Sequence, residues 1–330
     1  ALAPLGVSLR LARRLLAAVV RRDGFPAELP EVAPALLARI CRAADVPRLD
    51  LLEERVSPRD GFAKFLFRGA GQDTFEAVRI PLVHRPGAEK CIVCVSSQAG
   101  CALGCAFCAT GRLGFRRNLK TWEMVDQVVR LQAAAPQPVR GVVFMGMGEP
   151  LLNYDAVVRA ARIMSEPCGL AISAKAISIS TAGIAPGIRR MAAERLPFRL
   201  VVSLTSADPE RRRAVMPVEQ LHPLPELLAA VREYHATTGR RVTLAWTMIS
   251  GFNTRAEDAR QLAELTAGLP VTLDLIDVND PAGRYRPPGP AELAVFRDAL
   301  RAHLRQPVAR RYSGGADIHA ACGMLAGAAG

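Results

Sequence analysis

From about residue 90 onward, short apolar runs rich in β-branched residues alternate with segments whose apolar residues have helical spacing. A chain that repeats strand and helix in this way buries its strands in a parallel sheet with the helices outside. Six runs have strand character, namely 91–97, 141–146, 176–181, 200–204, 242–249 and 271–278. Helical spacing recurs between them, at 121–134, 154–165, 185–194, 222–236 and 256–266. The pattern predicts an α/β fold, a partial (β/α)6 barrel that is similar to a TIM barrel but left open.

The first 88 residues have a different pattern. Residues 7–22 place arginines between apolar positions at helical spacing, and residues 34–44 predict a second helix. Two apolar runs, 62–69 and 75–83, predict strands that pair as a hairpin. We therefore expect a small N-terminal α+β module over residues 1–88, followed by the barrel domain over residues 89–330.

The chain carries 43 Lys and Arg residues against 31 Asp and Glu, a formal net charge of +12. Such a surplus favours a polyanionic partner, usually nucleic acid, although a compositional bias toward Arg and Ala would also produce it. Basic residues cluster at five places: Arg10, Arg13 and Arg14; Arg21 and Arg22; Arg116, Arg117 and Lys120; Arg211 to Arg213; and Arg310 with Arg311. We expect the N-terminal helix and residues 116–120 to contact RNA. No apolar run is long enough to cross a bilayer and no signal peptide is evident, which predicts a cytoplasmic protein without a membrane partner.

Three of the eight cysteines, Cys101, Cys105 and Cys108, follow the first barrel strand in the pattern C-x3-C-x2-C. Thiols this close together, in a chain expected to be cytoplasmic, do not suggest disulfides. Structural zinc normally takes four ligands, commonly as two pairs, and no second pair is visible. A 4Fe–4S cluster can be held by thiolates from one tight loop. With three thiolates, one iron stays open to a substrate or cofactor, so the motif predicts an iron–sulfur cluster with an open position.

Polar groups also stand at the carboxyl ends of later strands, where barrels of this kind carry their chemistry. The glycine-rich turn at 144–150 ends one strand; its glycines let the backbone approach a ligand closely, and Glu149 offers an acceptor for an ammonium group. Hydroxyl and amide groups that could bind ribose, carboxylate or adenine end or follow three other strands, at Ser180, Ser203 and Asn279. Taken singly, each could equally be a turn residue or a helix cap.

The cysteine motif resembles the signature of radical S-adenosylmethionine (SAM) enzymes. In that superfamily the open iron binds the amino and carboxylate groups of SAM, and the reduced cluster cleaves SAM to a 5′-deoxyadenosyl radical. Four stretches narrow the resemblance to the RlmN/Cfr family of RNA adenosine methyltransferases: "CVSSQAGCALGCAFCATG", "FMGMGEPLLN", "SISTAGIAPGI" and "DIHAACGML". It extends into the N-terminal module through "KFLFRG" and "FEAVRIP". The resemblance implies a barrel of the radical-SAM type with a catalytic-cysteine segment at the C-terminal end.

The resemblance also implies the site residues. Cys101, Cys105 and Cys108 would hold the cluster, and SAM would contact Gly148, Glu149, Ser180, Ser203, Thr205 and Asn279. Two SAM molecules serve each turnover: one methylates Cys322, and the radical from the other takes a hydrogen atom from that S-methyl group. The carbon radical adds to adenine, and Cys94 then attacks the sulfur of Cys322, which frees the methylated RNA. The proton lost from adenine would go to Cys94 or to Glu76. Residue patterns alone would class both cysteines as buried thiols and Glu76 as a solvated strand-edge carboxylate.

The implied partners are 23S ribosomal RNA, with transfer RNA as an additional candidate, and an electron donor such as flavodoxin or ferredoxin. "GEPLLN" is closer to the branch that methylates carbon 2 of adenosine than to the carbon-8 branch. Three positions depart from the family pattern: Thr205 stands where histidine is usual, Asp280 instead of proline follows Asn279, and Gly314 replaces an arginine. Two alternatives therefore stay open. One is a diverged member that methylates carbon 8, another RNA or a nucleoside; the other is a basic RNA-binding protein whose cluster is only structural.

Overall fold

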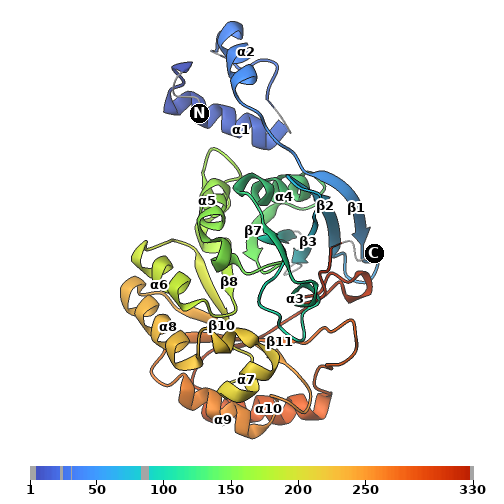
Figure 1. The fold of residues 1–330 in the computed structure, drawn as a ribbon, viewed down its shortest axis with the longest axis vertical. Coiled ribbons are helices and arrows are strands. Elements are labelled where there is room, and N and C mark those ends of the chain that lie inside the picture. Colours follow the sequence, from blue (N-terminus) through green and yellow to red (C-terminus); the bar gives the residue numbers. More distant parts are fainter. Residues whose placement is uncertain (1–4, 23–24, 31, 83–88, 328–330) are drawn as a thin grey trace.

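A computed structural model describes residues 5–22, 25–30, 32–82 and 89–327, and it is built around one ten-stranded sheet (Figure 1). The strand order is β1-β2-β3-β4-β7-β8-β9-β10-β11-β12. From β4 to β12 every neighbouring pair is parallel. The parallel strands are β4 (Lys90–Cys94), β7 (Val139–Phe144), β8 (Ile177–Thr181), β9 (Arg199–Ser203), β10 (Val242–Met248), β11 (Val271–Asp277) and β12 (Val308–Arg311).

The six predicted barrel strands are all present, and the open α/β barrel is confirmed. The five predicted helices occupy the crossovers: α4 (Thr121–Ala133), α5 (Tyr154–Ser165), α6 (Ala185–Ala193), α8 (Leu224–Thr238) and α9 (Ala256–Leu265). Further elements were not predicted: α3 (Ala109–Leu113), α7 (Pro209–Val215), α10 (Pro290–His303), and the 3-10 helices η2 (Pro150–Asn153), η3 (Ala174–Ala176), η4 (Pro217–Gln220) and η5 (Ala316–Ile318). Strand β12 was also missed, because "VARR" is largely exposed and lacks the apolar run of a buried strand.

The apolar strand runs supply the core. Leu244 and Trp246 of β10 and Leu273 and Leu275 of β11 are each buried to within 1% of full burial. Burying a side chain of this size stabilises the fold by about 1.5–3 kcal/mol. The Trp246 indole N–H also donates to the Asn253 carbonyl oxygen (3.1 Å), which satisfies its buried polar atom. This packing fixes the strand ends that carry the candidate site.

The N-terminal residues divide between two structures. Helices α1 (Leu9–Arg22) and α2 (Pro34–Ala43) pack on each other through Leu15, Leu37 and Ile40 and lie at one end of the molecule in Figure 1, where α1 meets the segment after α5. Strands β1 (Asp50–Val56), β2 (Ala63–Arg68) and β3 (Thr74–Leu82) instead extend the sheet, since β3 pairs with β4.

The predicted hairpin is confirmed by the antiparallel pairing of β2 and β3. Strand β1 was missed because its charged residues are exposed along the sheet edge. The predicted boundary after residue 88 borders the segment 83–88, which lies outside the described residues, so the division into 1–88 and 89–330 stays a prediction. Within the described part of the chain, none of the helices combines the length and the apolar character that crossing a bilayer requires.

Candidate active site

The three motif cysteines lie on a tight loop at the carboxyl end of β4. Two short strands close this loop, β5 (Gln98–Gly100) and β6 (Phe115–Asn118), and the Cys101 N–H donates to the Gly114 oxygen (3.0 Å). Gly100 has φ +73°, and a Cβ there would lie 1.9 Å from the same oxygen. The loop can therefore close this tightly only with glycine at that position.

Cys101, Cys105 and Cys108 line one cavity with about 990 Å³ of empty space, which is partly open to solvent. Burial removes water from these thiols, which disfavours their charged thiolate forms. It raises the pKa of Cys101 to about 12, and it also raises the pKa of Cys105. Iron binding would replace these thiol protons. No three His, Cys, Asp or Glu side chains among the described residues converge on one ion-sized point. A 4Fe–4S cluster needs no such point, because each cysteine binds a different iron; three thiols on one cavity wall fit such a cluster.

Glu149 lies in the same cavity and is only 3% exposed. Its carboxylate oxygens accept hydrogen bonds from the Leu151 N–H (3.0 Å) and the Ala182 N–H (2.7 Å). Burial raises the pKa of Glu149 to about 7, against the opposing effect of these hydrogen bonds. A cation placed beside this carboxylate would favour its ionised form. The α-ammonium group of SAM is such a cation.

Gly148 brings the turn before Glu149 into contact with the cluster loop. It has φ +96°, and a Cβ there would lie 2.5 Å from the Cβ of Gln98. The Gln98 amide oxygen accepts from the Glu149 N–H (2.8 Å), and its amide nitrogen donates to Asn118 (2.8 Å). Sequence analysis missed Gln98, which lacks ionisable chemistry and whose role depends on this close approach.

Three of the predicted polar residues also line the cavity: Ser180 at the end of β8, Ser203 at the end of β9 and Asn279 after β11. The Asn279 amide nitrogen donates to the Ser313 hydroxyl (2.9 Å) and lies 3.4 Å from the carbonyl oxygen of Cys322. Asn279 therefore links the carboxyl end of β11 to the C-terminal segment.

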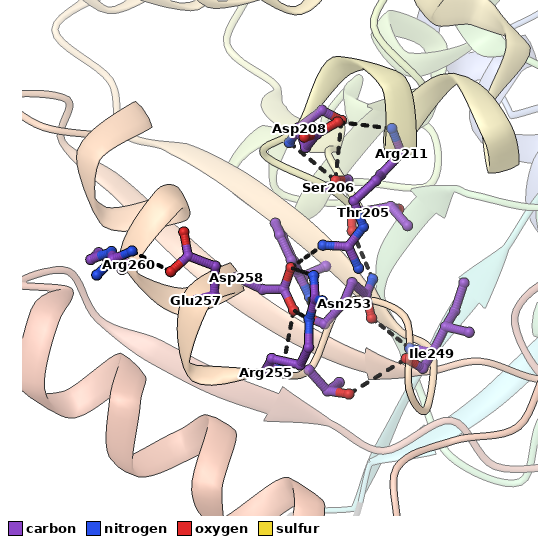
Figure 2. Close-up of polar contacts among 12 residues, drawn as sticks. Thr205, Ser206, Asp208, Arg211, Ile249, Asn253, Arg255, Glu257, Asp258 and Arg260 are labelled. Carbon is purple, nitrogen blue, oxygen red and sulfur yellow. Dashed lines mark hydrogen bonds and ion pairs between the residues drawn. The ribbon is translucent and has the colours of Figure 1, made fainter.

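Thr205 is placed differently. It is fully buried, is absent from the lining of the cavity, and adopts φ +61°, which is unusual for a β-branched residue. The Asn253 amide nitrogen donates to its carbonyl oxygen (2.7 Å), while the Asn253 side-chain oxygen accepts from the Ile249 N–H (2.7 Å). Figure 2 shows this amide joining the segments after β9 and β10, with the pair Arg211–Asp258 beside it. A contact between Thr205 and SAM stays a prediction.

The C-terminal segment docks against the cluster loop by backbone and side-chain hydrogen bonds. The Ala109 N–H donates to the Gly323 oxygen (2.7 Å), and the Thr110 hydroxyl donates to the Leu325 oxygen (2.6 Å). Cys322 is thereby placed beside the loop although more than 200 residues separate them. In Figure 1 this C-terminal segment lies next to α3 and the β1–β2 edge.

Cys94 and Cys322 line a second cavity of about 510 Å³ beside the first. Cys322 borders both cavities, as does Cys108. Cys94 is buried on β4, and burial raises its pKa far above the usual range, with a further contribution from Cys322. Cys322 is open to solvent through the cavities but has protein on most sides, which raises its pKa, while the Ser313 hydroxyl opposes that rise. The structure thus brings together the two thiols that the resemblance pairs.

The β1–β2 loop holds the same segment from the other side. The Ser57 hydroxyl donates to Asp317 (2.9 Å), and Asp60 accepts from the Gly315 N–H (2.8 Å). A Cβ on Gly314 would lie 2.5 Å from both Asp60 and Phe62. Glycine at position 314, in place of the arginine of the family pattern, therefore lets the β1–β2 loop pack directly on this backbone.

Glu76 is near the C-terminal segment but does not line either cavity. Its carboxylate pairs with Lys64 (2.9 Å) and accepts hydrogen bonds from the N–H groups of Ala326 (2.9 Å) and Gly327 (3.2 Å). In this arrangement the carboxylate ties the C-terminal segment to β3. A role as proton acceptor requires these bonds to open, and it stays a prediction.

Arg212 of α7 is a fully buried residue that sequence analysis recorded only as part of a basic run. It pairs with Glu219 (2.5 Å) and donates to the Ala182 oxygen (2.6 Å) and the Leu204 oxygen (3.2 Å). Arg212 therefore joins the carboxyl ends of β8 and β9, two strands that contribute to the cavity of the cluster cysteines. Arg212 differs from its neighbour Arg213 in being buried. A run of three arginines in the sequence does not show which of them is buried.

Most of the other clustered basic residues have partners inside the chain. Arg117 pairs with Glu123 (2.8 Å), Arg13 with Glu166 (3.5 Å), Arg310 with Asp277 (2.7 Å) and Arg311 with Asp274 (2.7 Å). Arg116 and Lys120 are exposed, whereas the side chains of Arg21 and Arg22 lie outside the described part of the chain. Contact between these clusters and RNA stays a prediction.

An open parallel barrel with three cysteines after its first strand defines a radical SAM protein, and residues 95–265 match the Radical SAM superfamily. A 4Fe–4S cluster and SAM are the cofactors that this superfamily implies. The "Probable RNA methyltransferase" of Myxococcus xanthus is 50% identical, with 99% of this chain and 90% of that protein covered. The "Probable dual-specificity RNA methyltransferase RlmN" of Symbiobacterium thermophilum is 44% identical, with 86% and 76% covered.

Among solved structures, a radical SAM methyltransferase from Sphaerobacter thermophilus matches with a TM-score of 0.87 and 38% identity, over 98% of this chain and 95% of that one. Together these matches identify the family. The chain belongs to the RlmN-type family of radical SAM RNA methyltransferases.

Proposed function

We propose that this protein methylates carbon 2 of an adenosine in 23S ribosomal RNA, and of transfer RNA as a second substrate, in the cytoplasm. The observation that carries the proposal is the position of Cys322, which borders both the cavity with the cluster cysteines and the cavity with Cys94. One thiol can therefore meet SAM on one side and an RNA base on the other. The names of the relatives, which are RNA methyltransferases, support an RNA substrate.

Each turnover uses two SAM molecules. The Cys322 thiolate attacks the methyl carbon of the first SAM. A carbon–sulfur bond forms on Cys322, the bond from the methyl carbon to the sulfonium breaks, and S-adenosylhomocysteine leaves. The raised pKa of Cys322 means that its thiol must lose a proton first, and the hydrogen bond with Ser313 favours the thiolate. Glu149 would hold the amino group of SAM and orient it.

Cys101, Cys105 and Cys108 would hold a cluster that, when bound and reduced, would supply the electron to cleave the second SAM to methionine and a 5′-deoxyadenosyl radical, with flavodoxin or ferredoxin as the donor class. That radical would take a hydrogen atom from the S-methyl group of Cys322 and become 5′-deoxyadenosine, and the methylene carbon left on Cys322 would add to the electron-poor carbon of adenine. The adduct would then lose one electron, for which the oxidised cluster is the acceptor class, and the proton of carbon 2, which Cys94 or Glu76 would accept.

Cys94 closes the cycle. Its thiolate attacks the sulfur of Cys322, the sulfur–carbon bond breaks, and the released carbon takes a proton to become the new methyl group. Cys94 and Cys322 are left as a disulfide, which two electrons must reduce before the next turnover.

The test is mass spectrometry of nucleosides from cellular RNA with and without the gene. Carbon-2 methyladenosine that disappears with the gene supports the proposal; carbon-8 methyladenosine would identify the other branch, and no change in either would refute it. Purified Cys94→Ala should accumulate a covalent RNA adduct and Cys322→Ser should not. Cys41→Ser is the matched control, because Cys41 is an exposed cysteine on α2 that lines neither cavity.

A further inference from the structure

Tyr312 is the most exposed large apolar or aromatic side chain among the described residues, with 76% of its surface open to solvent. It follows β12 directly and lines the second cavity, together with Cys94 and Cys322. Proteins that bind single-stranded RNA use exposed aromatic rings of this kind to stack against unpaired bases. Nothing in the proposed chemistry uses this ring.

Two contacts fix the ring in place. Its hydroxyl donates to the Asp60 carboxylate (2.9 Å), which also accepts from the Gly315 N–H (2.8 Å). The ring also packs on Phe62 in a T-shaped arrangement, with ring centroids 6.1 Å apart and an interplanar angle of 75°. The ring is therefore oriented before any ligand arrives, which lowers the entropic cost of binding.

The cavity beside Tyr312 suits a flat, uncharged ligand. Its side chains are apolar or carry sulfur and hydroxyl groups, and none of its lining residues is charged: Phe62, Val78, Ile80, Met145, Leu325 and Thr110 are typical. A phosphate would leave its charge unpaired there. A nucleobase carries no charge, and in this cavity it would lie beside Cys94 and Cys322.

We propose that Tyr312 is a stacking platform that receives the target base of the RNA as it enters the cavity of Cys94 and Cys322. The inference rests on the proposed function, because the base must belong to a nucleic acid. Stacking on an aromatic face is the common way in which proteins hold an unstacked RNA base. Asp60 is then a positioning residue, because it acts through the tyrosine hydroxyl.

The test uses a hairpin RNA with 2-aminopurine in its single-stranded loop, since stacking on tyrosine quenches the fluorescence of this base. With the reconstituted protein under anaerobic conditions, wild type should quench the fluorescence, and Tyr312→Ala should lose the quenching and about tenfold in RNA affinity. Tyr312→Trp, which keeps a π face but lacks the hydroxyl anchor, should recover part of both, whereas Tyr312→Leu, which keeps only apolar bulk, should recover neither.

Asp60→Asn and Tyr312→Phe both keep the ring but weaken or remove its anchor, so they should quench less than wild type and more than Tyr312→Ala. Leu221→Ala, which truncates another exposed apolar residue (71% exposed) that lines neither cavity, should behave as wild type. The affinity for SAM is measured in parallel. An equal loss of SAM and RNA affinity in Tyr312→Ala would mean a collapsed C-terminal segment and would overturn the stacking role.

Failure of the inference and failure of the proposed function give different results. If wild type methylates adenosine in RNA and Tyr312→Ala binds, quenches and methylates equally well, the inference is wrong and the proposed function stands. If wild type leaves RNA unmethylated, the proposed function is wrong, and the inference then fails with it.

Discussion

The ionisation of Glu149 should control how tightly the protein binds SAM. The carboxyl is 3% exposed, lines the cavity of the cluster cysteines, and has its pKa raised to about 7 by burial. The ammonium group of SAM can pair only with the ionised form. Affinity should therefore fall as the pH falls through 7.

The magnitude follows from the ionised fraction. With a pKa of about 7, half of the carboxyl is ionised at pH 7 and roughly one-eleventh at pH 6. The apparent association constant should then rise about fivefold from pH 6 to pH 7, and up to about tenfold if the thiolates of the cluster raise the pKa further. Replacing the charged pair with a neutral hydrogen bond costs about 2 kcal/mol, so Glu149→Gln should bind SAM about 30-fold more weakly.

The same pKa predicts how the stability of the folded protein depends on pH. Because the pKa of Glu149 is higher in the folded state than the ordinary glutamate value of 4.5, the folded state binds more protons between about pH 4.5 and pH 7. This carboxyl alone therefore lowers the free energy of unfolding as the pH rises through that window, by about 3 kcal/mol in total. Bound SAM should offset part of that loss, since it favours the ionised form.

Anaerobic calorimetric titration of the reconstituted protein with SAM at pH 6.0, 6.5 and 7.0 measures the effect. Glu123→Gln is the matched control, because Glu123 is a fully buried carboxylate that lines neither cavity and caps α4 instead. The control should keep the pH dependence of wild type, and Glu149→Gln should lose it. A Glu149→Gln protein with the affinity and pH profile of wild type would refute the reasoning.

Three further substitutions test the surrounding structure. Gly148→Ala should bind SAM at least tenfold more weakly and destabilise the fold by about 2 kcal/mol, because a Cβ at φ +96° would collide with Gln98 2.5 Å away; calorimetry and thermal unfolding measure both. Arg212→Met should lower the free energy of unfolding by about 3–5 kcal/mol, because it leaves the buried Glu219 carboxylate without its charged partner. The double change Arg212→Met with Glu219→Met should recover much of that loss, as measured by urea unfolding. Thr205→Val should stabilise the protein by about 1 kcal/mol, because the buried Thr205 hydroxyl has no hydrogen-bond partner among the described residues; a lower melting temperature would show that this oxygen is satisfied.

The barrel could be predicted from the sequence because its strands are buried on both sides. Such strands read as continuous apolar runs, and the six runs from 91–97 to 271–278 all appear as parallel strands. Strands β1 and β12 could not be predicted in this way. Both lie at the edges of the sheet, and their exposed charged residues carry no apolar run.

The residues of the candidate site also differ in whether the sequence could predict them. The cysteine motif and the turn with Gly148 and Glu149 follow two strands that were predicted from the sequence, β4 and β7, and the structure places them in one cavity. Gln98 and Arg212 were missed as site residues, since their roles come from what they contact across the fold. Thr205, in contrast, was named as a site residue from its place in a motif. That place did not reveal the buried conformation that its neighbours impose.

The two candidate catalytic cysteines differ in how firmly the fold holds them. Cys94 ends a strand of the sheet, with ladder partners on both sides, in β3 and β7. Cys322 stands on an irregular segment that is held by separate hydrogen bonds from Ala109, Thr110 and Asn279. A thiol that must meet SAM, then an RNA base, then a second thiol has to change its position between steps. Such a segment can shift by exchanging a few hydrogen bonds, whereas a central strand cannot shift without breaking the sheet. This difference supports the proposed roles, in which Cys322 carries the methyl group and Cys94 is the fixed thiol that it meets at the end of the cycle.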